Sequence, residues 1–218
     1  MGEFVPLMAL MVSLVALSID AMLPALPRIG LELGVEAEND QQLVISALFL
    51  GLGVGQMIYG PLSDSVGRKP AIYSGYVIFV IGCVVSILST SFEIMLAGRV
   101  LQGMGAAGPR IVCIALMRDQ YEGREMARIM SFVMGVFILV PALAPAMGQG
   151  IIMLSHWRGI FVVFLGLALV SWGWFVLRQP ETLPPERRIR FSVSVIWSGV
   201  LGTCRNRVAF GYTISAGL

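Results

Sequence analysis

The chain has 218 residues, of which 57% are hydrophobic and only 13% charged, and its formal net charge at pH 7 is +2. A soluble domain carries about 25% charged residues, so this composition excludes an ordinary soluble domain and predicts a surface that largely faces lipid. The arginines are interleaved with long apolar runs, and this pattern excludes a nucleic-acid partner.

Six apolar segments are long enough to cross a bilayer as helices, which takes about 20 mostly apolar residues each. In chain order, their approximate bounds are 4–26, 41–62, 71–90, 94–117, 129–154 and 159–177. They predict an all-α membrane protein in which residues 1–177 form a six-transmembrane-helix bundle.

The chain changes character after residue 177. Residues 178–207 form a polar linker on the cytoplasmic side, in which Pro180, Pro184 and Pro185 argue against a continuing helix. Within it, residues 191–204 fit a short interfacial helix. Residues 208–218 are apolar, but at 1.5 Å per residue they cover about 16 Å, roughly half of the bilayer core. We interpret this last segment as the severed start of a seventh transmembrane helix.

Basic residues predict the orientation of the chain in the membrane. With the amino terminus in the cytoplasm, the inner loops hold eleven of the 15 arginines and lysines, and the outer loops hold only Arg28 and Arg158. The other two, Arg99 and Arg110, lie within the fourth segment. We therefore expect a multi-pass protein of the cell (cytoplasmic or inner) membrane with a cytoplasmic amino terminus.

Three charged residues, Asp20, Arg99 and Arg110, lie within the predicted spans. A charge at the centre of a membrane helix costs about 2.5–3.5 kcal/mol on insertion scales, so each is a candidate functional residue. Asp20 and Arg99 fall at matched depth, about six residues from the outer end of their helices, and could meet or share a cavity. A carboxylate beside a guanidinium stays ionised, whereas one in apolar surroundings takes a proton.

Other readings of these charges stay open. Asp20 and Arg99 also fit a structural ion pair, and either one could snorkel from near a helix end. Arg110 lies about 16 Å further inward than Arg99, on the same helical face. It could line the same cavity near the cytoplasmic mouth, attract anions, or snorkel to the interface.

The loop after the second segment reads GPLSDSVGRKP, starting at Gly60. Gly60 permits close backbone approach, and Gly67 permits an unusual turn. Asp64 can pair with Arg68 or with the positive end of a helix. Taken alone, these residues and Lys69 also fit a charged inner turn that fixes the topology.

This loop resembles the signature loop of the major facilitator superfamily, Gly-x-x-x-Asp-x-x-Gly-Arg-Lys. The sequence RVLQG from Arg99 resembles the fourth-helix motif of that family. Residues 18–27, SIDAMLPALP, resemble the first-helix segment of the Bcr/CflA-type multidrug efflux transporters, and His156-Trp157-Arg158 fits the same group. The chain as a whole resembles the amino-terminal half of such a transporter.

The fifth segment resembles the antiporter motif of the family. Its matching residues are Gly135, Pro141, Pro145 and Gly148. The segment lacks the glycine that precedes the first proline in the fuller pattern, and this departure leaves antiport against symport open. Both prolines remove backbone donors and are expected to bend the helix.

The resemblance implies half of a twelve-helix fold, built from two three-helix inverted repeats. It implies a secondary transporter that couples drug efflux to proton entry by alternating access, with the proton gradient in place of a cofactor. It also implies Asp20 as the proton and cation site, Arg99 as its coupling partner, and Asp64 with Arg68 as part of an inner gate. The expected partners are small amphipathic, often cationic substrates, membrane lipids, and the missing carboxyl-terminal half.

The sequence also bears on three other functions. A proton-coupled symporter of another small molecule and a non-transporting truncated half both remain compatible with the residues. A membrane enzyme is disfavoured, because His156 is the single histidine and lies at an outer helix end, away from any catalytic set. The methionines and aromatics of the spans, such as Met22, Met57 and Phe137, either line a drug pocket or contact lipid and neighbouring helices.

Overall fold

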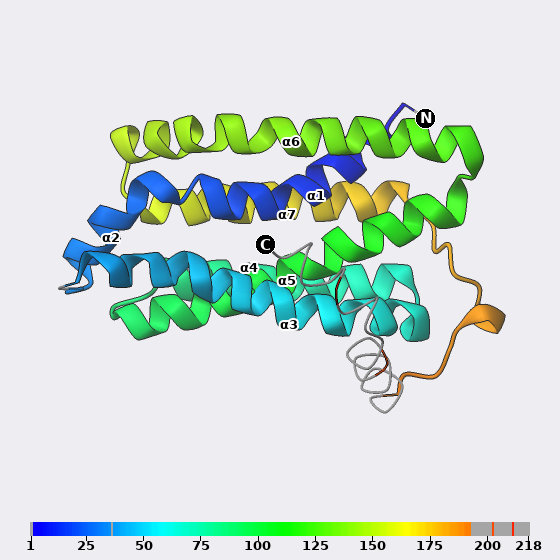
Figure 1. Cartoon of the computed structure of the whole chain (residues 1–218), viewed down its shortest axis with the longest axis horizontal. Coiled ribbons are helices and arrows are strands. Elements are labelled where there is room, and N and C mark those ends of the chain that lie inside the picture. Colours follow the sequence, from blue (N-terminus) through cyan, green and yellow to red (C-terminus); the bar gives the residue numbers. More distant parts are fainter. Residues whose placement is uncertain (1, 36, 193–201, 203–210, 212–218) are drawn as a thin grey trace.

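The computed structural model describes residues 2–35, 37–192, 202 and 211, and these residues form a bundle of long helices without strands (Figure 1). Six helical spans are long and apolar enough to cross a membrane. The predicted all-α class and the multi-pass arrangement are therefore confirmed. The expected helices over 191–204 and 208–218 fall almost entirely outside the described residues.

The helical elements follow the predicted order, and five of the six spans agree with the predicted bounds to within six residues. The elements are α1 Phe4–Asp20, η1 Leu23–Ala25, α2 Leu26–Glu32, η2 Glu38–Gln42, α3 Leu43–Val66, α4 Arg68–Ile87, α5 Phe92–Gln120, α6 Gly123–Leu154, α7 Arg158–Arg178 and η3 Pro185–Arg187.

The first span differs from the prediction, because it is broken rather than continuous over residues 4–26. α1 ends at Asp20, η1 follows, and α2 carries the span on to Glu32. Two prolines explain the break. Pro24 has no N–H to donate to the carbonyl of Asp20, and Pro27 has none for the carbonyl of Leu23.

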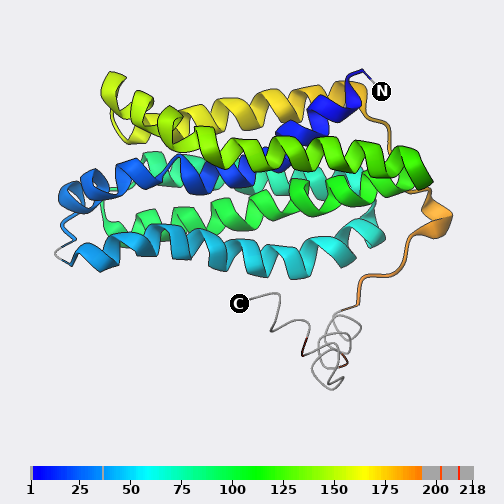
Figure 2. The ribbon, with the colours of Figure 1, turned by 45° about the horizontal axis from the view of Figure 1, so that its top comes forward.

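The helices pack in two groups of three (Figures 1 and 2). α5 lies against α3 and α4, whereas α1 lies against α6 and α7. The first helix of each predicted three-helix repeat therefore packs on the second and third helices of the other repeat. This reciprocal packing supports the predicted pair of repeats. It also places α1 and α5, which carry Asp20 and Arg99, next to each other.

Glycines bring the main chains of α5 and its neighbours into contact. A Cβ at Gly103 would lie 2.0 Å from the carbonyl oxygen of Leu48 on α3, and a Cβ at Gly51 would lie 1.9 Å from that of Val100. A Cβ at Gly82 on α4 would lie 2.4 Å from the backbone nitrogen of Gln102. Small residues permit such close helix packing in membranes, and here they fix the position of α5.

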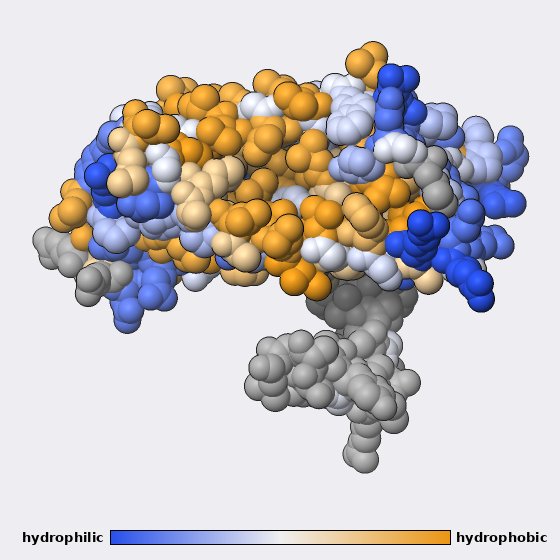
Figure 3. All heavy atoms as spheres, turned by 90° about the horizontal axis from the view of Figure 1, so that it is seen from above, coloured by the Kyte–Doolittle hydropathy of each residue, from blue (hydrophilic) through white to orange (hydrophobic). Residues whose placement is uncertain are grey.

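The surface has an apolar middle and polar ends, as Figure 3 shows for one face. Large apolar side chains are exposed along α6, among them Ile138 at 73% and Phe132 at 63%. An apolar belt between two polar ends is the surface that a bilayer requires.

Candidate functional site

Arg99 lies between α1, α3, α5 and α7, near the start of α5, and is fully buried. Its Nε donates to the carbonyl of Val44 on α3 at 3.1 Å, and its Nη1 donates to Oε1 of Gln102 at 2.5 Å. Its Nη2 donates to the carbonyl of Ser18 on α1 at 2.7 Å. One guanidinium thus joins α1, α3 and α5.

The carbonyl of Ser18 accepts this bond because α1 is about to break. In a continuing helix it would accept from the N–H of Met22, but that N–H donates to Ile19 at 3.4 Å instead. The last carbonyls of a helix need other partners. Arg99 supplies one, so its position depends on the break that Pro24 and Pro27 cause.

Asp20 lies two residues after Ser18 and is half-buried. The bond between Arg99 and Ser18 confirms the expectation that Asp20 and Arg99 lie at matched depth. The two charges do not form an ion pair, however, and Arg99 pairs with no carboxylate among the described residues. Backbone carbonyls and an amide occupy the guanidinium, and the Asp20 carboxylate, two residues after Ser18 on α1, has no charged partner in the described chain.

Further residues around Arg99 were not predicted from the sequence. Cζ of Arg99 lies 5.8 Å from the ring centroid of Phe161 on α7, on the face of the ring. Gln102, which accepts from Arg99, donates through Nε2 to Sγ of Cys83 at 3.2 Å. Only Gln102 carried a sequence signal, as part of the fourth-helix motif.

Arg110 does not join this site. It is half-buried, and its Cζ lies 5.7 Å from the ring centroid of Phe137 on α6. Eleven residues of helix separate it from Arg99, about 16 Å along α5. A role for Arg110 in the same cavity stays a prediction, and its contact is with an aromatic face.

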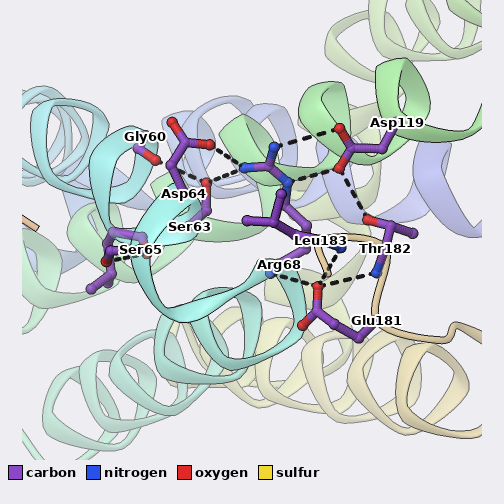
Figure 4. Close-up of polar contacts among 10 residues, drawn as sticks. Gly60, Ser63, Asp64, Ser65, Arg68, Asp119, Glu181, Thr182 and Leu183 are labelled. Carbon is purple, nitrogen blue, oxygen red and sulfur yellow. Dashed lines mark hydrogen bonds and ion pairs between the residues drawn. The ribbon is translucent and has the colours of Figure 1, made fainter. Parts of the chain in front are cut away.

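The turn between α3 and α4 holds a second cluster around Arg68, whose side chain is 8% exposed (Figure 4). Arg68 donates to Oδ1 of Asp64 at 2.5 Å and to Oδ2 of Asp119, at the end of α5, at 2.9 Å. It also donates to Oγ of Ser63 at 2.9 Å. The expected pairing of Asp64 with Arg68 is present, and Asp119 extends it to a third helix.

Glu181, in the segment after α7, holds the first turn of α4. Its carboxylate accepts from four backbone N–H groups at 2.9 to 3.1 Å, those of Arg68, Lys69, Thr182 and Leu183. Burial raises the pKa of Glu181, but the four hydrogen bonds outweigh burial and lower the pKa below its ordinary value. The linker is therefore bound to the bundle here, and the N–H of Ile189 adds a bond to the carbonyl of Asp64 at 3.0 Å.

The two glycines of the loop behave differently. Gly67 has φ 109° and ψ 162°, so the expected unusual turn is confirmed. The close backbone approach expected at Gly60 is wrong within the described chain, because a Cβ there would meet nothing within 4 Å. Gly60 faces away from the neighbouring helices. Nζ of Lys69 lies 5.9 Å from the ring centroid of Tyr73, whose ring also packs against Trp172 and Phe175 on α7.

One residue of the fifth-helix motif reaches the Asp20 region. A Cβ at Gly148 would lie 2.0 Å from the carbonyl oxygen of Ala21, directly after Asp20. Pro141 and Pro145 lie inside α6, which continues through both, and a Cβ at Gly135 would meet nothing within 4 Å. The motif thus packs against the broken part of the first span at Gly148, and no neighbouring helix of the described chain contacts it at Gly135.

The opposite end of the bundle has a cluster around Glu32. Its carboxylate accepts from Nε1 of Trp157 at 2.7 Å, and Nε2 of His156 lies 2.8 Å away. Arg158 also pairs with Glu32 and donates to the carbonyls of Ile87 and Ser89 at 3.1 and 2.9 Å. The cluster joins α2, the end of α4 and the start of α7.

Comparison with known proteins identifies the same architecture. A family model described as the Major Facilitator Superfamily matches residues 8–217. The chain is 31% identical over 213 residues to an uncharacterised transporter of this type from Bacillus subtilis, with 97% of this chain and 53% of the relative covered.

Two relatives have names that refer to drug resistance. A chloramphenicol resistance protein from Pseudomonas aeruginosa is 33% identical, with 86% of this chain and 44% of the relative covered. A bicyclomycin resistance protein homologue from Haemophilus influenzae is 32% identical, with 91% and 50% covered.

Among solved structures, the human organic anion transporter MFSD10 has the same fold, with a TM-score of 0.66. It is 21% identical, and the match covers 85% of this chain and 49% of that one. The chain thus spans about half the length of the proteins that it matches.

Proposed function

Because the chain belongs to the major facilitator superfamily, we propose that it is the amino-terminal half of a proton-coupled drug efflux transporter. The relatives named for chloramphenicol and bicyclomycin resistance support drug export as the activity. Small amphipathic, often cationic compounds are the proposed substrates. The proton gradient drives their exchange without a cofactor, and a carboxyl-terminal half completes the working protein.

The observation that carries this proposal is the position of Arg99 against the broken first span. The fully buried guanidinium donates to the carbonyl of Ser18, two residues from Asp20. A carboxylate that alternates between a polar and an apolar setting binds and releases a proton. Asp20 is the proposed group that does so, and a cationic substrate competes with the proton for it.

The Arg68 cluster is the proposed inner gate. Asp64, Arg68 and Asp119 fix the ends of α3, α4 and α5 to one another. A half that moves as a rigid body in alternating access needs such fixed ends. With the amino terminus in the cytoplasm of a cell membrane, as the basic residues favour, this gate faces the cytoplasm.

Proton-driven uptake of a fluorescent cationic dye into energised inside-out vesicles tests the proposal. The chain is joined to a carboxyl-terminal half, and Asp20→Asn is compared with Asp40→Asn, because Asp40 lies on the exposed η2 turn. We expect uptake that a protonophore and Asp20→Asn abolish and that Asp40→Asn leaves intact. Uptake that survives Asp20→Asn contradicts the assignment of Asp20.

The same vesicles distinguish symport, which the departure in the fifth-helix motif keeps as the second candidate. An antiporter accumulates substrate in inside-out vesicles when their interior is acidic. A symporter instead accumulates substrate in right-side-out vesicles when the outside is acidic. Accumulation only in the second case would replace antiport by symport.

A further inference from the structure

The Arg99 guanidinium has an aromatic neighbour, Phe161, to which the proposed function assigns no role. All three nitrogens of the group are occupied at its edge, by the carbonyls of Val44 and Ser18 and by the amide of Gln102. None of these acceptors carries a full negative charge. A fully buried cation without a carboxylate is costly, so its remaining surroundings matter for its position.

The ring of Phe161 presents its face to the Arg99 guanidinium. The ring centroid lies 5.8 Å from Cζ of Arg99, within the range of a cation–π interaction, and the ring is fully buried. The face of an aromatic ring is negative, and it attracts a guanidinium most strongly where water is excluded.

The ring of Phe161 is itself held in place by its neighbours on the same side of the bundle. Trp157 meets it edge-on at 6.2 Å and 81°, and Phe164 meets it at 6.1 Å and 84°. Trp157 in turn donates to Glu32 at 2.7 Å. The orientation of the ring is therefore determined by packing, and it presents a fixed π face to α5.

We propose that Phe161 is a positioning residue for Arg99. Its π face supplies the negative counterpart that the buried guanidinium lacks and keeps Nη2 on the carbonyl of Ser18, beside Asp20. The contact also joins α7 to a site otherwise built from α1, α3 and α5. For its transport readout this inference rests on the proposed function, whereas its stability readout does not.

Fluorinated phenylalanines at position 161 separate the π face from simple packing. Mono-, di- and trifluorophenylalanine have nearly the same size, but each fluorine weakens the negative face of the ring. A cation–π contact predicts a stepwise fall in proton-driven dye uptake, between about 2-fold and 30-fold over the series. The pH profile of uptake is expected to shift in the same steps, because the guanidinium is then held less firmly on the carbonyl of Ser18, two residues before the proposed proton site Asp20.

Phe175 provides the matched control, since it is also fully buried on α7 but packs against Tyr73 rather than Phe161. The same fluorinated residues at position 175 are expected to leave uptake and its pH profile unchanged. Phe161→Leu removes the ring altogether and gives the largest loss of uptake that the fluorinated series can approach. Equal uptake and one pH profile across the fluorinated series at 161 would overturn the proposal.

The thermal unfolding midpoint of the same proteins in detergent keeps this test independent of transport. A midpoint that falls stepwise at 161 and stays constant at 175 supports the cation–π contact even if the parent protein moves no dye, a result that would refute only the proposed function. A constant midpoint at 161 together with unchanged transport rejects the contact itself.

Discussion

At the scale of single residues, three charged side chains, Arg68, Glu181 and Arg99, are each held by several short contacts. Arg68 donates to Asp64, Asp119 and Ser63, and the carboxylate of Glu181 accepts from four backbone N–H groups. Arg99 donates to three acceptors. A planar guanidinium has five N–H groups in fixed directions, so an arginine can join three helices where a lysine cannot.

Arg68→Lys tests the inner cluster. Lysine keeps the charge but cannot reach Asp64, Asp119 and Ser63 together, and each lost bond to a charged group costs about 1.5–3 kcal/mol. We expect proton-driven dye uptake by the full-length transporter to fall about tenfold or more. Lys69→Gln is the control, and it should cost less than about fivefold, because Lys69 lies only over the ring of Tyr73. Equal losses would contradict a special role for Arg68.

Glu181→Gln tests the anchor of the linker and its pH dependence. The lowered pKa of Glu181 means that its stabilisation is fully present above the ordinary value of 4.5 and is lost as the pH falls through the lower, folded-state value. At pH 7 the anchor is therefore intact in the parent and weakened in the variant, because the glutamine amide keeps one acceptor oxygen but has no charge and places an NH2 group where the second oxygen accepted. We expect the amides of Arg68 and Lys69 to exchange hydrogen about tenfold faster in Glu181→Gln.

Glu125→Gln is the control for that experiment, because Glu125 is exposed in the first turn of α6. Its amide exchange at Arg68 and Lys69 should match the parent. Acidifying the parent below the folded-state pKa of Glu181, which lies under 4.5, should reproduce the effect of Glu181→Gln after correction for intrinsic exchange. Unchanged protection in the variant would show that the carboxylate does not hold the linker.

Spacing in the sequence predicted only the local part of these clusters. Asp64 and Arg68 are four residues apart, and their pairing was expected. Asp119 is 51 residues from Arg68 and Glu181 is 113, so their contacts depend on the three-dimensional arrangement of the helices. Phe161 was missed for the same reason. An apolar residue in an apolar span looks the same in the sequence whether or not it faces a cation in the folded protein.

At the scale of helices, the packing of α5 depends on positions without a side chain. Gly103→Ala would place a Cβ 2.0 Å from the carbonyl oxygen of Leu48, and α3 would have to move away from α5. Overpacking of this kind costs about 1–3 kcal/mol, so we expect a clearly lower thermal unfolding midpoint in detergent. Gly53→Ala on α3 has open space around it and should be neutral or slightly stabilising. Equal midpoints would contradict this account of the packing.

The break in the first span is the element that hydropathy did not predict. An apolar run gives the length of a span, but it does not show whether the run is one helix. The prolines at 24 and 27 were visible in the sequence, and their missing donors could have indicated the break. The other five spans were predicted closely, because each is a long apolar run between charged loops.

Pro24→Ala restores a backbone donor for the carbonyl of Asp20. We expect α1 to continue further, Met22 to compete with Arg99 for the carbonyl of Ser18, and dye uptake to fall about tenfold while the unfolding midpoint stays level or rises. Pro6→Ala is the control, because Pro6 lies in the first turn of α1, where no N–H is needed for the helix. Full activity in Pro24→Ala would show that the break is dispensable.

At the scale of the whole molecule, the chain matches about half of each relative and exposes apolar side chains along α6. The open space at Gly135 and Gly60 lies on α6 and α3. The proposed carboxyl-terminal half would cover such faces in a complete transporter, and lipid would cover them otherwise. Function distinguishes them, because alternating access needs two halves that move against each other.

We therefore expect the 218-residue chain alone to insert and fold without moving dye, and co-expression with a separate carboxyl-terminal half to restore uptake. The helices of the bundle pack on one another within the described chain, and we therefore expect the bundle to fold without the partner. Circular dichroism of the purified chain checks folding, and uptake into inside-out vesicles checks activity, with Asp20→Asn in the co-expressed pair as control. Uptake by the 218-residue chain alone would mean that copies of this half assemble into a working transporter, and the exposed face of α6 would then be their interface.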